Sequence, residues 1–112
     1  MVSGLTNNSR FLEGTETVSF RVVDSAAAFS VEHVLCSELT WKQLQQSATL
    51  GIEGQALNIE MDKADLDEVE APRPIVGSRI QRTATDNSKW RVQSVIYDHV
   101  IGVYRCICSE IR

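Results

Sequence analysis

Three cysteines and two histidines are the side chains in this sequence best suited to bind a metal or to act as nucleophiles. Cys106 and Cys108 are two residues apart, which places both thiols on one face of a strand. His33 and Cys36 form a His-x-x-Cys pair that could complete a four-ligand zinc site with them. Zinc sites normally contain Cys-x-x-Cys knuckles, which are missing here, and free cysteine behaves as a small buried hydrophobe. We therefore expect buried thiols, with no metal and no cofactor.

Catalytic motifs are absent from the sequence. It has no nucleophile elbow, no phosphate-binding glycine loop and no His-Glu-x-x-His pair. His99 falls in an expected turn, where a solvated side chain is more frequent than a general base. His33 lies in an apolar run, which favours a core histidine bonded to a backbone carbonyl. The carboxylates of residues 62–70 lack the spacing of a calcium loop and are expected to form a solvated face. The sequence therefore predicts no catalytic residues and a protein that is not an enzyme.

The formal net charge of the chain is −4, but its charges are unevenly distributed. Residues 62–72 hold five carboxylates and one lysine, whereas residues 73–112 hold seven basic side chains and three acidic ones. Such a polar molecule could stack head to tail with copies of itself, because opposite charges orient the encounter. The alternative is that basic side chains solvate one sheet face beside an acidic loop. Overall acidity disfavours a nucleic-acid partner.

Length and composition limit the chain to one domain and one core. No stretch reaches the roughly 18 to 20 consecutive apolar residues that cross a bilayer, so we expect no membrane partner. The odd cysteine count argues against a disulfide framework and favours a reducing compartment. Residues 1–14 are polar and show no period, which predicts a flexible N-terminal arm before a single β domain of residues 15–112.

The strands expected from alternation and bounding turns are residues 15–23, 29–39, 55–62, 78–83, 89–98 and 103–111. Residues 29–39 are ambiguous, because some of their apolar residues recur at helical spacing; we favour a strand there. The acidic stretch 63–71 could form one helical turn before the prolines of residues 72–74 impose an extended course.

A short helix is expected to begin at Trp41. Thr40 and Gln43 have the spacing of a capping box, in which each side chain bonds the backbone of the other residue. Trp41, Leu44 and Ala48 share one helical face, and we expect this apolar stripe to pack on the sheet.

The last expected strand, residues 103–111, has no polar face. Its apolar residues point alternately to two sides: Val103, Ile107 and Ile111 to one, and Tyr104, Cys106 and Cys108 to the other. A strand that is apolar on both sides must be covered on both. We expect the core to cover one side and either the Trp41 helix or another chain to cover the other, which indicates oligomerisation.

These elements together predict a mainly β fold, a small antiparallel β-barrel or sandwich of about six strands with one short α-helix. Their order over the second half of the chain resembles that of the head completion, or head-to-tail connector, proteins of tailed bacteriophages and prophages. The resemblance rests on the strand 57–61, Pro72-Arg73-Pro74, Gly77-Ser78-Arg79-Ile80, Trp90-Arg91-Val92, the segment 104–108 and the final Arg112.

This resemblance implies a non-enzymatic structural protein that forms a ring between the portal and the tail. It implies self-association, contacts with portal, adaptor and tail proteins, and a location in the bacterial cytoplasm during assembly and then in the virion. The candidate interface residues are Trp41, Arg73, Arg79, Arg82, Arg91 and Tyr104.

The alternative function is a small OB-like or SH3-like β-barrel module that binds nucleic acid or peptide. Its contacts would come from Arg79, Arg82, Arg91 and Trp90, because an aromatic ring between basic residues can stack on bases. Trp90 shares a strand face with Val92, however, and this pairing favours a core position for the indole.

Overall fold

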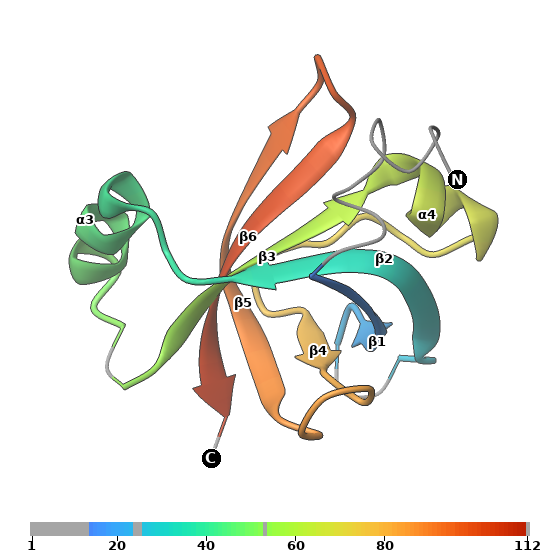
Figure 1. The fold of residues 1–112 in the computed structure, drawn as a ribbon, viewed down its shortest axis with the longest axis horizontal. Helices are drawn as coiled ribbons and strands as arrows, with labels where there is room; N and C mark the ends of the chain where they lie inside the picture. The colour runs from blue at the N-terminus through green and yellow to red at the C-terminus, as the bar shows by residue number, and fades with distance from the viewer. Residues whose placement is uncertain (1–13, 24–25, 53, 112) are drawn as a thin grey trace.

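The computed structural model of the chain describes residues 14–23, 26–52 and 54–111. Six antiparallel strands close into a barrel in the order β1-β2-β3-β6-β5-β4 (Figure 1). The strands are β1 (Thr15–Arg21), β2 (Phe29–Ser37), β3 (Ala56–Asp62), β4 (Arg79–Gln81), β5 (Lys89–Asp98) and β6 (Val103–Ile111), and the helices are α3 (Trp41–Thr49) and α4 (Lys63–Glu68). The predicted mainly β class is thus confirmed, in its barrel form. The predicted arm, apart from Gly14, lies outside the described residues.

Two three-stranded meanders, β1-β2-β3 and β4-β5-β6, form the barrel by pairing β3 with β6 and β4 with β1. The acidic stretch after β3 forms α4, whose Leu66 is 2% exposed and belongs to the core. The core is a single cluster of side chains that point into the barrel, and its large members include Phe20, Met61, Trp90 and Tyr104. Trp90 is 3% exposed, which confirms its core position, and its indole N–H donates to Ser88 Oγ over 2.7 Å.

Two β-bulges change which residues point inward. Between the pairs Val18–Val31 and Glu16–Val34, β2 has one residue more than β1. Val31 and Val34 are therefore both fully buried although they are three residues apart. The bulge explains the mixed periodicity of residues 29–39, which form the favoured strand up to Ser37. A second bulge in β5, between Val92 and Ser94, shifts the inward positions in the same way.

Residues 103–108 of β6, apart from the partly exposed Arg105, are buried on both faces by their own molecule. Tyr104 is 4% exposed and Cys106 is fully buried in the core, whereas Ile107 is 3% exposed on the outer face. Ile107 lines a groove beneath α3, as does Gln43. Interpreting β6 as a sign of oligomerisation was therefore wrong, because no second chain is needed to cover it.

Helix α3 begins at Trp41 with the predicted capping box, but its orientation is the reverse of the prediction. None of its residues is buried, and Trp41 and Leu44 are 75% and 49% exposed. Gln43 and Gln46 line the groove on the barrel side instead. Figure 1 shows α3 to one side of the barrel. Neither described helix combines the length and apolar character that crossing a membrane requires.

Candidate interaction surfaces

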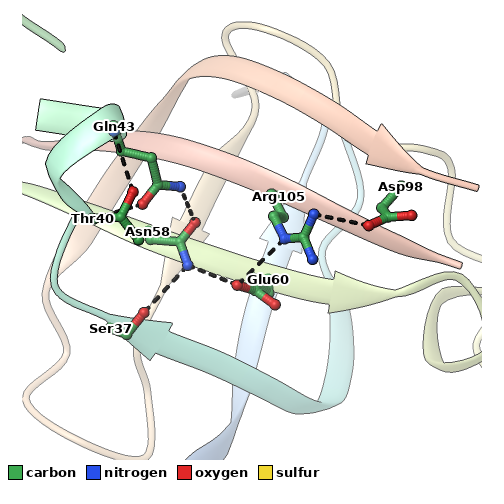
Figure 2. A network of polar contacts seen from close by, with 7 residues as sticks. All are labelled: Ser37, Thr40, Gln43, Asn58, Glu60, Asp98 and Arg105. Atoms are coloured by element: carbon green, nitrogen blue, oxygen red, sulfur yellow. Dashed lines mark hydrogen bonds and ion pairs between the residues drawn. The ribbon is translucent and has the colours of Figure 1, made fainter. Parts of the chain in front are cut away.

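The side chain of Gln43 fixes α3 to the barrel (Figure 2). Its Oε1 accepts a hydrogen bond from the backbone N–H of Thr40 over 2.9 Å, and Thr40 Oγ1 accepts one from the backbone N–H of Gln43 over 3.2 Å. Gln43 Nε2 donates a hydrogen bond to Oδ1 of Asn58 in β3 over 2.8 Å. One side chain thus starts the helix and holds its polar face toward the barrel, which leaves the apolar face outward.

Asn58, 4% exposed on the outer side of β3, links α3 to the hairpin formed by β5 and β6. Its Nδ2 donates to Ser37 Oγ over 3.2 Å and to Glu60 Oε2 over 2.9 Å. Glu60 Oε2 lies 3.7 Å from Arg105 Nε, and another guanidinium nitrogen of Arg105 donates to Asp98 Oδ2 over 3.0 Å (Figure 2). Because leaving a buried polar group unsatisfied is costly, this network couples the position of α3 to the base of the hairpin.

The β5–β6 hairpin projects past the end of the barrel (Figure 1). Asp98 shapes its turn, since Oδ1 accepts from the backbone N–H of Val100 over 3.1 Å. Desolvation tends to raise the pKa of Asp98, but hydrogen bonds from Arg105 and from the turn backbone outweigh it and lower the pKa below its ordinary value. Val100 and Ile101 at the tip are 80% and 52% exposed. A polar base thus supports an apolar tip.

A groove of about 360 Å³ separates α3 from the outer faces of β3, β5 and β6. The residues that line it include Lys42, Gln43 and Gln46 from the helix and Ile96, Arg105 and Ile107 from the sheet. Ile107 is buried at the floor of this groove, whereas Ile96 is 49% exposed and is the isoleucine that a partner could contact.

A second cleft, of about 370 Å³, lies on the outer face of β1, β4 and β5. Arg79 pairs with Arg21 on one side and with Arg91 on the other, so three arginines lie in a row across three strands. Lys89 is on the same face of β5. Of the described residues that line this basic cleft, four are cationic and none is acidic. Lys89 and Arg91 are exposed, so their positive charges are accessible to a partner.

The structure brings two of the predicted interface residues, Arg79 and Arg91, together in this basic cleft. The prediction missed Arg21 and Lys89, which complete the cluster. Alternation puts Lys89 on the face of Arg91 and puts Arg21 on the outer face of β1, but only the strand order makes β1 a neighbour of β4.

The other four predicted interface residues lie apart. Trp41 is exposed on α3, and Arg73 is exposed in the segment between α4 and β4. Arg82 binds Glu16 through two hydrogen bonds of 3.0 and 2.8 Å, and both side chains are less than one-fifth exposed. Tyr104 is buried against Tyr97, with ring centroids 4.5 Å apart. Arg82 and Tyr104 therefore make these contacts within their own molecule.

The residues considered for zinc binding do not converge. Cys106 and Cys108 are buried, and desolvation raises the pKa of Cys106 to about 12 and that of Cys108 well above its ordinary value. His33, which was expected in the core, is exposed, because the β2 bulge gives it a φ of 60° and turns it outward; its Nδ1 lies 3.0 Å from Asp65 Oδ1. Over residues 14–23, 26–52 and 54–111, no three His, Cys, Asp or Glu side chains are grouped to hold a metal ion.

Two kinds of surface thus stand out: apolar side chains on projecting elements, and a cluster of cations on the barrel wall. Comparisons with protein-family models, curated proteins and solved structures gave no match. Exposed apolar patches and concentrated charge are both characteristic of contacts with other macromolecules.

Proposed function

We propose that this protein is a non-enzymatic structural component of a phage or prophage particle, which assembles with its own copies into a ring and joins the head to the tail. The observation that supports this most is the outward-facing apolar side of α3. Trp41 is 75% exposed there, although a surface helix ordinarily turns such a residue toward the core. An exposed apolar helix face held in place by hydrogen bonds is suited to bind a partner.

The hairpin tip supplies a second apolar surface, on a different element. Contact between α3 of one copy and the hairpin tip of the next would be heterologous, and such contacts close into a ring when the rotation between subunits permits. The network from Gln43 to Asp98 fixes these two surfaces relative to each other within one subunit. A fixed angle between them is what a ring of defined size requires.

The role at the head–tail junction rests on the resemblance in element order, including the strand 57–61 and the prolines of residues 72–74. Self-association and this role can be tested separately. Sedimentation velocity over a range of concentrations measures association, and negative-stain electron microscopy distinguishes closed rings from open filaments.

Trp41→Ser should shift the wild-type oligomer to monomer. The control is Gln45→Ser, which changes an exposed polar residue of the same helix and should leave association unchanged. A protein that stays monomeric at every concentration, alone and with portal protein, would contradict the proposal; so would an oligomer that Trp41→Ser does not weaken.

The basic cleft favours a second candidate, a barrel module that binds nucleic acid or an acidic peptide through Arg79 and Arg91. Two of its expected contacts are otherwise engaged, since Trp90 is 3% exposed and Arg82 binds Glu16. Bases would therefore lack the aromatic platform expected at Trp90. Salt-sensitive binding of a single-stranded DNA oligonucleotide would support this candidate over the first.

A further inference from the structure

We infer that the basic cleft receives the acidic helix α4 of a second copy of the chain. This inference extends the proposed function. It rests on that function because it takes a second copy of the chain as the partner. The surfaces involved are separate from the apolar faces of α3 and the hairpin, so the two contacts can be tested independently.

The charge of the cleft identifies the chemistry of its partner. The described residues that line it include Arg21, Arg79, Lys89 and Arg91 and no carboxylate, and of these four Lys89 and Arg91 are exposed. The whole chain has a formal net charge of −4, and removing these four positive charges leaves −8 on the rest. The carboxylates of a second copy thus offer the cleft a complementary charge, and the overall acidity of the chain disfavours a nucleic acid as the partner.

The densest run of carboxylates in the sequence forms α4 and the residues that follow it. Asp65 lies against His33 and Asp67 against Lys63, both within ion-pair distance. Glu68 and Glu70, which are exposed, lie beyond these pairs. We call Glu68 and Glu70 the acidic knob.

The topology places the acidic knob and the cleft on opposite sides of the barrel. In the strand order β1-β2-β3-β6-β5-β4, the cleft is centred on β4, and β3 is three strands away in either direction. Helix α4 follows β3 and packs against β2 and β3.

The two surfaces also lie at opposite ends of the barrel. The backbone N–H of Lys63 bonds Gly102 in the hairpin turn, whereas Lys89 of the cleft pairs with Ile111 at the other end of β6. A knob on one side and a cleft on the other cannot meet within one molecule. Between copies they form a head-to-tail contact of the kind that builds rings.

Charge reversal tests this contact in the full-length protein. Arg91→Glu in the cleft and Glu68→Lys in the knob each place like charges across the interface, and we expect each to lower the association constant at low ionic strength by about tenfold or more. Both residues are exposed, so the fold should tolerate either change. Thr85→Glu, which adds a carboxylate at an exposed site outside the cleft, is the control and should have little effect.

An equimolar mixture of the two variants is the decisive sample. The acidic knob of the Arg91→Glu copy can enter the basic cleft of the Glu68→Lys copy, so mixing should restore the association that each change weakens. High ionic strength should weaken the wild type and the mixture alike.

The outcomes separate this inference from the proposed function. If Trp41→Ser abolishes association but neither charge reversal alters it, or if mixing restores nothing, the charge contact is wrong and the ring assembly stands. If the wild type never associates, both are wrong. If Arg91→Glu instead abolishes binding of a labelled single-stranded DNA oligonucleotide and leaves association unchanged, the cleft is a nucleic-acid site and the inference is overturned.

Discussion

Apolar side chains are buried in the barrel interior but exposed on helix α3. Inside the barrel, Phe20 and Ile59 are fully buried and are held by packing from several strands. On α3, Trp41 and Leu44 face solvent, and the helix is held by its cap and by one hydrogen bond to Asn58. The barrel therefore derives its stability from burial, whereas the position of the helix depends on polar contacts. An apolar side chain that does not stabilise its own subunit is available to stabilise a contact with another.

The largest expected difference in unfolding free energy is between two variants that each truncate an aromatic side chain. Phe20→Ala should lower the free energy of unfolding by about 3 to 5 kcal/mol, because it leaves a cavity in the closed barrel. Trp41→Ala should change it by no more than about 0.5 kcal/mol, because the indole is largely solvated. Urea unfolding at a concentration where the protein is monomeric measures both. Equal losses would show that α3 is part of the core.

Asn58→Ala tests whether polar contacts hold α3 in place. The change removes the bridge from Gln43 to Glu60 and should cost about 1 to 3 kcal/mol, because buried polar partners lose their hydrogen bonds. Amide exchange in α3 should become faster in the variant than in the wild type, whereas exchange in β1 should change little. Ser94→Ala, which alters the same groove outside the network, is the control. Unchanged exchange in α3 would show that something other than the network anchors the helix.

Thr40→Ala should have a smaller effect of about 1 kcal/mol, typical of a lost N-cap. Gln43 would retain its bond to Asn58, so the helix should fray at its first turn and keep its orientation. Amide exchange of residues 41–44, measured by NMR, reports this fraying. Thr49→Ala, near the other end of α3, should leave those amides unaffected.

The smallest effect is expected from the exposed pair of His33 and Asp65. The hydrogen bond to Asp65 raises the pKa of His33 above its ordinary 6.5, so the protonated form is favoured in the folded state. The stabilisation is complete below pH 6.5 and is lost as the pH rises through the folded-state pKa. Because the imidazole is 45% exposed, solvent screening limits the effect to less than about 1 kcal/mol.

His33→Gln tests this pair. The difference in unfolding free energy between the wild type and the variant should be larger at pH 5.5 than at pH 8.5. A difference that grows with rising pH would have the wrong sign and would exclude the pair as its source.

Local sequence patterns were sufficient to predict most of the barrel. Alternation in residues 55–62 located β3, and the capping box located the start of α3. The bulges in β2 and β5 were not predictable, because an extra residue is defined only relative to the partner strand. This is why His33 was placed in the core and is instead on the surface.

The orientation of α3 and the composition of the cleft share one reason for being missed. Trp41, Leu44 and Ala48 form an apolar face in the sequence, but Asn58, a residue of another element, decides which face turns inward. The arginines of the basic cleft come from β1, β4 and β5, which only barrel closure brings together. Both features depend on contacts between elements that periodicity does not encode.

The buried thiols have a practical consequence. Cys106 and Cys108 line the sealed interior, and desolvation raises the pKa of Cys36 and Cys106 to about 12, so almost no reactive thiolate exists at neutral pH. A thiol reagent such as Ellman's should therefore leave Cys106 and Cys108 unmodified until strands separate. The rate at which those two react would then report the rate of barrel opening, with no cysteine introduced by mutation.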